Sequence, residues 1–135
     1  MKTIRHNTFE TNSSSTHSLL ILTEEENYKM NNGELYLTNK YDETIITKEE
    51  RDAIFYEAIS NYNETIVDYN DEMGAKLITT IEEFMETDDY LDNRSEFPCD
   101  IYEWSDREYL AYDSANYTSP SGDKLVIHVV YGNDY

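Results

Sequence analysis

The sequence is poor in the residues on which several common kinds of site depend. A single cysteine, Cys99, excludes an internal disulfide and a cysteine-rich metal site, so we expect an ordinary reduced thiol. No apolar run approaches the length of a membrane-spanning helix, and the N-terminus lacks the apolar core of a signal peptide. We therefore expect a cytoplasmic protein with no membrane segment.

Basic residues are also scarce. Lys and Arg together number 10 against 29 Asp and Glu, which leaves a formal net charge of −19 over 135 residues. A surface of this charge repels the phosphates of DNA, RNA and anionic membranes, and it attracts basic protein surfaces. We expect no direct binding to nucleic acid and a partner that is itself basic.

Aliphatic residues are sparse, but aromatic residues compensate for them. The chain has 13 tyrosines and 4 phenylalanines, and an aromatic ring buries much apolar area per residue. Together with clearly periodic segments, these rings favour a folded chain over a disordered one, despite the high net charge. The length predicts a single domain over residues 1–135 with one modest core.

The N-terminal part of the chain predicts strands. Residues 2–5 form a candidate short strand, residues 19–22 (LLIL) predict a buried strand, and residues 34–38 alternate like a half-buried one. The turn signal Asn-Asn-Gly at 31–33 predicts that the second and third runs pair as an antiparallel hairpin with a longish loop.

Two capping boxes predict helices in the middle of the chain. Thr47 and Glu50 precede apolar residues at helical spacing, which predicts a helix from about residue 48 to residue 63 or beyond. Thr80 and Glu83 open a second, shorter helix, and residues 75–79 between the two helices form a strand or a linker.

The C-terminal part again predicts strands. One is expected around residues 109–112, and the turn-rich residues 119–123 lead to the strand 124–131, which contains His128 as a packed or edge histidine. The element order predicts an α+β fold, with a mainly antiparallel sheet covered by two helices.

The stretch TNSSSTHS, residues 11–18, is dense in hydroxyl, amide and imidazole groups. It has no glycine of the kind that lets a phosphate-binding loop approach an anion, and no glycine-flanked serine like that of many hydrolases. We expect a loop stabilised by side-chain hydrogen bonds to its own backbone. The alternative is a nucleotide- or phosphate-handling enzyme whose site uses Arg5, Asn12, Ser13, Ser14, Ser15 and His17.

Metal and cofactor sites are not indicated. His6, Glu10 and His17 do not lie on a segment with helical periodicity, which would be needed to align the first two. Residues 68–74 begin like an EF-hand loop, but Met73 occupies the position of the required glycine. We expect no metal, no cofactor and no catalytic residue.

A stretch rich in acids and aromatics, residues 86–113, is the main candidate interface. Carboxylates on a rigid scaffold can imitate nucleic-acid phosphates, and aromatic rings can anchor a protein interface. An ordinary solubilising face is the alternative, although so large a charge destabilises a fold. The candidate partner-binding residues are Glu86, Asp88, Asp89, Asp92, Glu96, Asp100, Glu103, Trp104, Asp106 and Glu108.

The opening residues also carry a resemblance. The run FETNSSSTHS, residues 9–18, together with Arg5 and Asn7, resembles the N-terminus of small phage and prophage proteins, mostly from Gram-positive bacteria. The resemblance covers about the first 20 residues and implies a mobile-element origin, without carrying over any catalytic residue. Small acidic phage proteins include inhibitors of host defence, among them anti-CRISPR proteins that resemble DNA.

The function expected from these features is inhibition without catalysis. An acidic nucleic-acid mimic would block the basic groove of a host defence effector, such as a CRISPR-Cas nuclease, in the cytoplasm of a bacterial host cell. The alternatives are the nucleotide- or phosphate-handling enzyme and a phage regulator of a host polymerase.

Overall fold

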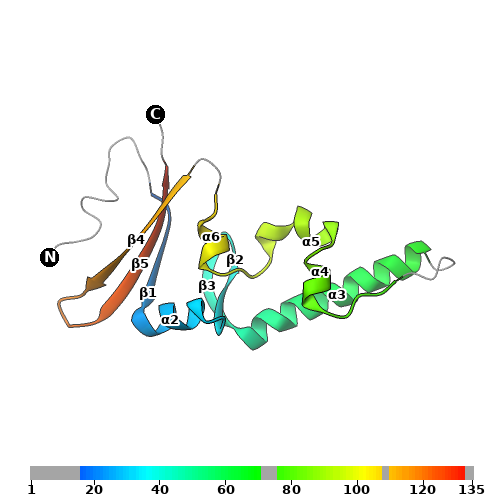
Figure 1. The fold of residues 1–135 in the computed structure, drawn as a ribbon, viewed down its shortest axis with the longest axis horizontal. Coiled ribbons are helices and arrows are strands. Elements are labelled where there is room, and N and C mark those ends of the chain that lie inside the picture. Colours follow the sequence, from blue (N-terminus) through cyan, green and yellow to red (C-terminus); the bar gives the residue numbers. More distant parts are fainter. Residues whose placement is uncertain (1–15, 71–75, 108–109, 133–135) are drawn as a thin grey trace. The chain divides into compact units, whose positions relative to one another are not determined.

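The structure, a computed structural model, describes residues 16–70, 76–107 and 110–132 (Figure 1). In this part of the chain, helices occur together with antiparallel strands, which confirms the predicted α+β class. None of the helices described is long and apolar enough to cross a membrane.

The contacts divide the chain into two compact units. The first unit joins residues 1–35 to residues 100–135, and the second unit consists of residues 36–99. That the whole chain forms a single domain stays a prediction.

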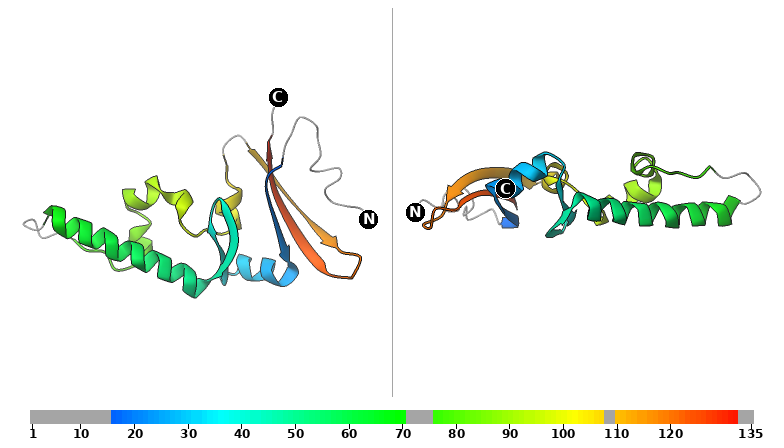
Figure 2. Two further views of the ribbon diagram at one scale, coloured as in Figure 1. Left: turned by 180° about the vertical axis from the view of Figure 1, so that it is seen from behind. Right: turned by 90° about the horizontal axis from the view of Figure 1, so that it is seen from below.

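A three-stranded antiparallel sheet is the centre of the first unit. It consists of β1 (Thr16–Thr23), β4 (Leu110–Thr118) and β5 (Lys124–Gly132), in the order β1-β5-β4. All three correspond to predicted strands, and the predicted short strand at 2–5 lies outside the described residues. β5 is the central strand, because it pairs with β1 along one edge and with β4 along the other (Figure 2).

The turn between β4 and β5 forms as its residue types predict. The Ser119 N–H donates to the Asp123 carbonyl at 2.8 Å, and the Gly122 N–H donates to the Ser119 carbonyl at 2.9 Å. Gly122 has a φ of 95°, a conformation that glycine adopts without the steric cost of a Cβ.

The predicted hairpin between residues 19–22 and 34–38 is wrong. The chain instead forms α2 (Glu24–Asn31), which begins at a capping box formed by Thr23 and Glu26. The Asn-Asn-Gly run ends this helix: the Gly33 N–H donates to the Met30 carbonyl at 3.2 Å, and the Glu34 N–H donates to the Lys29 carbonyl at 2.9 Å. These bonds define a Schellman motif, in which Gly33 supplies the positive φ of 76°.

The helix α2 packs against two strands of the three-stranded sheet, β1 and β5. Leu20 and Leu22 are buried, whereas Leu19 and Ile21 are 46% and 52% exposed, so β1 is buried on one face only. A short helix, α6 (Ile101–Ser105), follows residue 100 and contributes further buried side chains to this unit.

The second unit contains a β-hairpin and a long helix. β2 (Leu35–Asn39) pairs with β3 (Asp42–Thr47), and α3 (Lys48–Asn70) follows directly. Three short elements come next, with α4 in contact with α3 (Figure 1). They are α4 (Ile81–Phe84), α5 (Asp88–Asp92) and the 3-10 helix η1 (Arg94–Glu96).

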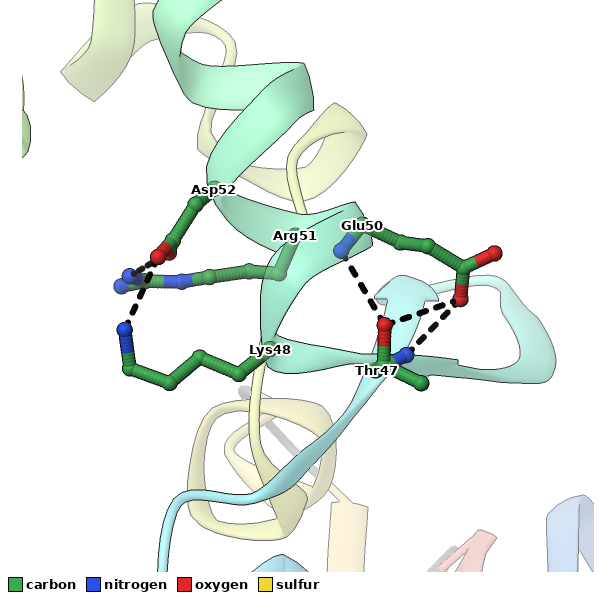
Figure 3. A network of polar contacts seen from close by, with 5 residues as sticks. All are labelled: Thr47, Lys48, Glu50, Arg51 and Asp52. Carbon is green, nitrogen blue, oxygen red and sulfur yellow. Dashed lines mark hydrogen bonds and ion pairs between the residues drawn. The ribbon is translucent and has the colours of Figure 1, made fainter.

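Both predicted capping boxes are confirmed. The Thr47 N–H donates to Glu50 Oε1 at 2.9 Å, while the Glu50 N–H donates to Thr47 Oγ1 at 3.1 Å (Figure 3). The Thr80 and Glu83 pair makes the same reciprocal bonds at the start of α4.

The segment before α4 is a linker fastened to α3 by one amide side chain. Residues 76–79 have no regular secondary structure. Asn63 on α3 donates from Nδ2 to the Ile78 carbonyl at 2.8 Å and accepts at Oδ1 from the Ile78 N–H at 3.0 Å. These two bonds satisfy both backbone groups of a buried residue.

The core of the second unit is an aromatic cluster, which we define as Phe55, Phe84, Tyr90 and Phe97. Phe55 is fully buried, and its ring centroid lies 6.1, 6.0 and 5.3 Å from those of the other three rings. Ile59, Ile78 and Ile81 complete this core. The cluster joins α3 to the short helices, so rings carry the packing in this aliphatic-poor chain.

Candidate acidic interaction surface

Five predicted partner-binding residues lie on the segment from the end of α4 to η1. Their side chains are all exposed, and we call them the acidic surface: Glu86, Asp88, Asp89, Asp92 and Glu96. Among the described residues, none of these five carboxylates takes part in an ion pair.

Local capping explains why this acidic segment is ordered. Thr87 is the N-cap of α5, and its hydroxyl accepts from the Tyr90 N–H at 3.2 Å. Asp88 and Asp89 occupy the first turn, where negative charge interacts favourably with the helix dipole. At the other end, Asn93 donates from Nδ2 to the Asp89 carbonyl at 2.9 Å.

The aromatic residues of the same segment point to the core. Tyr90 is buried and Phe97 is half-buried, and both belong to the aromatic cluster, with ring centroids 5.5 Å apart. The general expectation that rings of this stretch anchor a partner therefore does not apply to Tyr90 and Phe97, which hold the segment in place from inside. The segment thus places its carboxylates in solvent and its rings in the interior.

The remaining predicted interface residues belong to the first unit. Asp100 is exposed, but its Oδ1 accepts from the Glu103 N–H at 2.8 Å as the N-cap of α6. Trp104 is 0% exposed, so its predicted role as a partner-binding residue is wrong. Its ring is an interior group, because burying the large indole removes more apolar area from water than displaying it. Asp106 is exposed, and Glu108 lies outside the described residues.

The N-terminal motif is mostly outside the described residues. This applies to Arg5, Asn12 and residues 13–15, and the structure does not describe the side chain of His17. The backbone of β1 begins at Thr16, and its register with β5 is irregular between Thr16 and Ser18. In the described part of the chain, no group of three or more His, Cys, Asp or Glu side chains could hold a metal ion.

Two basic residues are engaged at the start of α3. Lys48 Nζ lies 2.8 Å from Asp52 Oδ2, and Arg51 Nη1 lies 2.9 Å from Asp52 Oδ1 (Figure 3). The hydrogen bond from Lys48 lowers the pKa of Asp52, and the same bond raises the pKa of Lys48. Both cations pair with Asp52 of α3, and in the described part of the chain neither forms an ion pair with a carboxylate of the acidic surface.

A groove of about 360 Å³ lies where α3 faces α5 and η1. Three rings of the second unit line it, from Tyr62, Phe84 and Phe97, and the carboxylate residues Asp89 and Glu96 line it as well. The remaining lining residues are Ala58, Asn61, Thr65 and Asn93. The groove therefore joins part of the acidic surface to the aromatic cluster.

The contribution of α3 to this groove cannot be predicted from the sequence. The helical spacing of residues 48–63 places Tyr62 on an apolar face, but it does not indicate that this face lines a groove. Asn61 and Thr65 carry no signal of their own, because their relevance depends on which segment packs beside α3. The α2 helix, by contrast, had a readable signal in the Thr23 to Glu26 capping box.

His128 and Cys99 are buried groups of ordinary structural character. His128 Nε2 lies 2.8 Å from Asn27 Oδ1, and Nδ1 lies 2.7 Å from the Tyr112 hydroxyl, which confirms a packed histidine. Burial lowers the pKa of His128. Cys99 is buried and takes part in no disulfide. No protein-family model, curated protein or solved structure matches this chain.

Proposed function

We propose that this protein is a non-enzymatic inhibitor of phage type. Its carboxylates imitate the phosphates of a nucleic acid and occupy the basic groove of a host defence effector, such as a CRISPR-Cas nuclease, in the bacterial cytoplasm. The observation that carries the proposal is the display of the acidic surface: five exposed carboxylates stand on a segment that the aromatic cluster holds from inside.

Ordered carboxylates suit this role for an energetic reason. A flexible acidic tail loses conformational entropy when it binds, whereas short capped helices packed on a core have already lost it. The acidic surface has this organisation, because α5 is capped by Thr87 and anchored by the buried Tyr90. The ordered backbone therefore presents these carboxylates to a partner at set spacings along the segment.

The net charge supports the same partner class. At −19, the chain attracts a basic groove over long range and accelerates encounter with it, and nucleic acid is repelled. The N-terminal resemblance to phage and prophage proteins points to a partner in host defence. An acidic mimic needs no catalytic group, since occupancy of the groove is sufficient for inhibition.

The experiment begins with capture on the immobilised full-length chain from a bacterial host lysate, over a salt series, with mass spectrometry. The proposal expects a basic nucleic-acid-binding protein that is released as salt rises, and competition by that protein's own nucleic acid. Capture of partners that are not nucleic-acid-binding proteins, or binding unaffected by the nucleic acid, refutes the mimic.

A variant without the five charges of the acidic surface then tests this surface itself. Replacing Glu86 and Glu96 by Gln, and Asp88, Asp89 and Asp92 by Asn, preserves shape while removing the charges. We expect binding at low salt to weaken about tenfold or more, and its salt dependence to become shallower. Asp100 is left unchanged, because its removal would also break the α6 cap.

The matched control removes the same charge elsewhere. The positions Glu34, Glu49, Glu57, Glu64 and Glu82 are exposed, and all five are changed to Gln. Both variants carry the same net charge, so a difference between them reports the position of the acids. Equal losses in the two variants would show that only bulk charge matters and would contradict this surface as the binding site.

A further inference from the structure

The groove beside α3 combines features that select one kind of side chain. Its lining includes the rings of Tyr62, Phe84 and Phe97 and the carboxylate residues Asp89 and Glu96. Its volume of about 360 Å³ is at the low end of the range of about 300–1,000 Å³ in which pockets hold small ligands. A single long side chain of a partner is therefore a suitable occupant.

Two hydrogen-bond donors on the groove are engaged within the protein. Thr65 Oγ1 donates to the Asn61 carbonyl at 3.0 Å, and Asn93 Nδ2 donates to the Asp89 carbonyl at 2.9 Å. The carboxylates of Asp89 and Glu96 make no hydrogen bond or ion pair among the described residues. The negative charge and the available acceptor atoms of these two carboxylates favour a cationic donor in the groove and disfavour an anion.

The same aromatic cluster already binds one guanidinium within the protein. Arg51 Cζ lies 4.9 Å from the ring centroid of Phe55 and 4.9 Å from that of Tyr36. Its Nη1 also pairs with Asp52 at 2.9 Å (Figure 3). This arrangement of a guanidinium over rings beside a carboxylate has the same chemical components as the groove.

We propose that the groove receives an arginine side chain of the basic partner, an inference that rests on the proposed function. The guanidinium would pack on the rings while its N–H groups donate to the carboxylates of Asp89 and Glu96. Arginine fits better than lysine, because a planar guanidinium stacks on aromatic rings and presents several donors in a fixed fork. The groove thus supplies a specific anchor within an otherwise diffuse electrostatic contact.

The test uses the purified full-length chain and three capped tripeptides, Gly-Arg-Gly, Gly-Lys-Gly and Gly-citrulline-Gly. Binding is followed by ¹H–¹⁵N chemical shifts. We expect the arginine peptide to shift the amides of Asp89, Asn93 and Phe97 saturably. The lysine peptide should bind several-fold more weakly, and the citrulline peptide, which lacks the charge, should leave these amides unmoved.

A pair of variants separates the groove from bulk charge. The double variant Asp89→Asn with Glu96→Gln should weaken binding of the arginine peptide at least fivefold. The matched control Glu49→Gln with Glu57→Gln, which removes the same charge from exposed positions of α3, should change it less than twofold. Circular dichroism spectra that superimpose on the wild type show that the variants remain folded.

Either of two results overturns the inference: equal affinity for the arginine and lysine peptides, or equal weakening by the two double variants. The titration needs no partner, so its failure leaves the acidic-mimic proposal standing on its own capture experiment. If the capture experiment fails but the titration shows saturable arginine binding, the acidic-mimic proposal is refuted. The specificity of the groove for arginine then still holds.

Discussion

Removing the ring of Phe55 tests whether the aromatic cluster holds the second unit together. Phe55 is fully buried, and three rings surround it at centroid distances of 5.3 to 6.1 Å. Truncating a buried Phe to Ala costs about 3–5 kcal/mol in the free energy of unfolding. The ring pairs, together with the guanidinium of Arg51 at 4.9 Å, place Phe55→Ala in the upper part of that range, at about 4–5 kcal/mol.

The assay is urea denaturation, followed by circular dichroism at 222 nm for the helices. The neighbouring variant Tyr56→Ala is the control, since Tyr56 is 52% exposed on the same helix. This substitution should change the free energy of unfolding by no more than about 0.5 kcal/mol. Fluorescence of Trp104, the single tryptophan, follows the first unit in the same samples.

The two probes also test the single-domain prediction. If the chain is one cooperative domain, the unfolding transitions followed by circular dichroism and by fluorescence should coincide in the wild type and shift together in Phe55→Ala. Units that unfold separately would show a shift in the helical signal alone. A loss below about 2 kcal/mol for Phe55→Ala, or one no larger than that of Tyr56→Ala, would refute the reasoning about the cluster.

Two further predictions concern single local interactions. Thr47→Ala removes the hydroxyl that accepts from the Glu50 N–H at the start of α3, and it should lower the free energy of unfolding by about 1 kcal/mol in the same urea assay; no loss would contradict the cap. For His128, burial lowers the pKa in the folded state below the ordinary value of 6.5, so between these two values the unfolded chain binds more protons than the folded one. The stability contributed by the neutral ring is therefore complete above about pH 7 and is lost as the pH falls through 6.5 towards the lowered pKa. The free energy of unfolding, measured at pH 7.5 and pH 5.5, should fall with acid more steeply in the wild type than in His128→Gln, and equal slopes would contradict this assignment.

The helices predicted from the sequence rest on local signals. The bonds between Thr47 and Glu50 form within four residues, and the apolar spacing of α3 needs only the helical period. The turn at residues 119–123 is equally local, since Gly122 and the neighbouring serines close it by themselves. Such features could be predicted because no distant contact is needed to decide them.

The incorrect hairpin prediction shows the limit of what short-range sequence signals can determine. An Asn-Asn-Gly run suits a tight β-turn and also suits a helix C-terminus, because glycine supplies a positive φ in either case. The decision came from the capping box at Thr23 and from α2 packing on β1 and β5. The short, continuous apolar run from Leu19 to Leu22 predicts a strand, but its partner, β5, begins about 100 residues later at Lys124.

Composition and order along the chain determined the acidity of this protein, its reliance on rings for a core, its α+β class and the starts of its main helices. Tertiary packing decided which side chains of the acid-aromatic stretch are available to a partner. Tyr90 and Phe97 joined the interior and Trp104 was buried, while Asp89 and Glu96 came to line a groove beside α3. The physical reason is that burial depends on contacts between segments that are distant in the sequence. A sequence pattern indicates the chemistry of a side chain, but it does not indicate which other residues cover it.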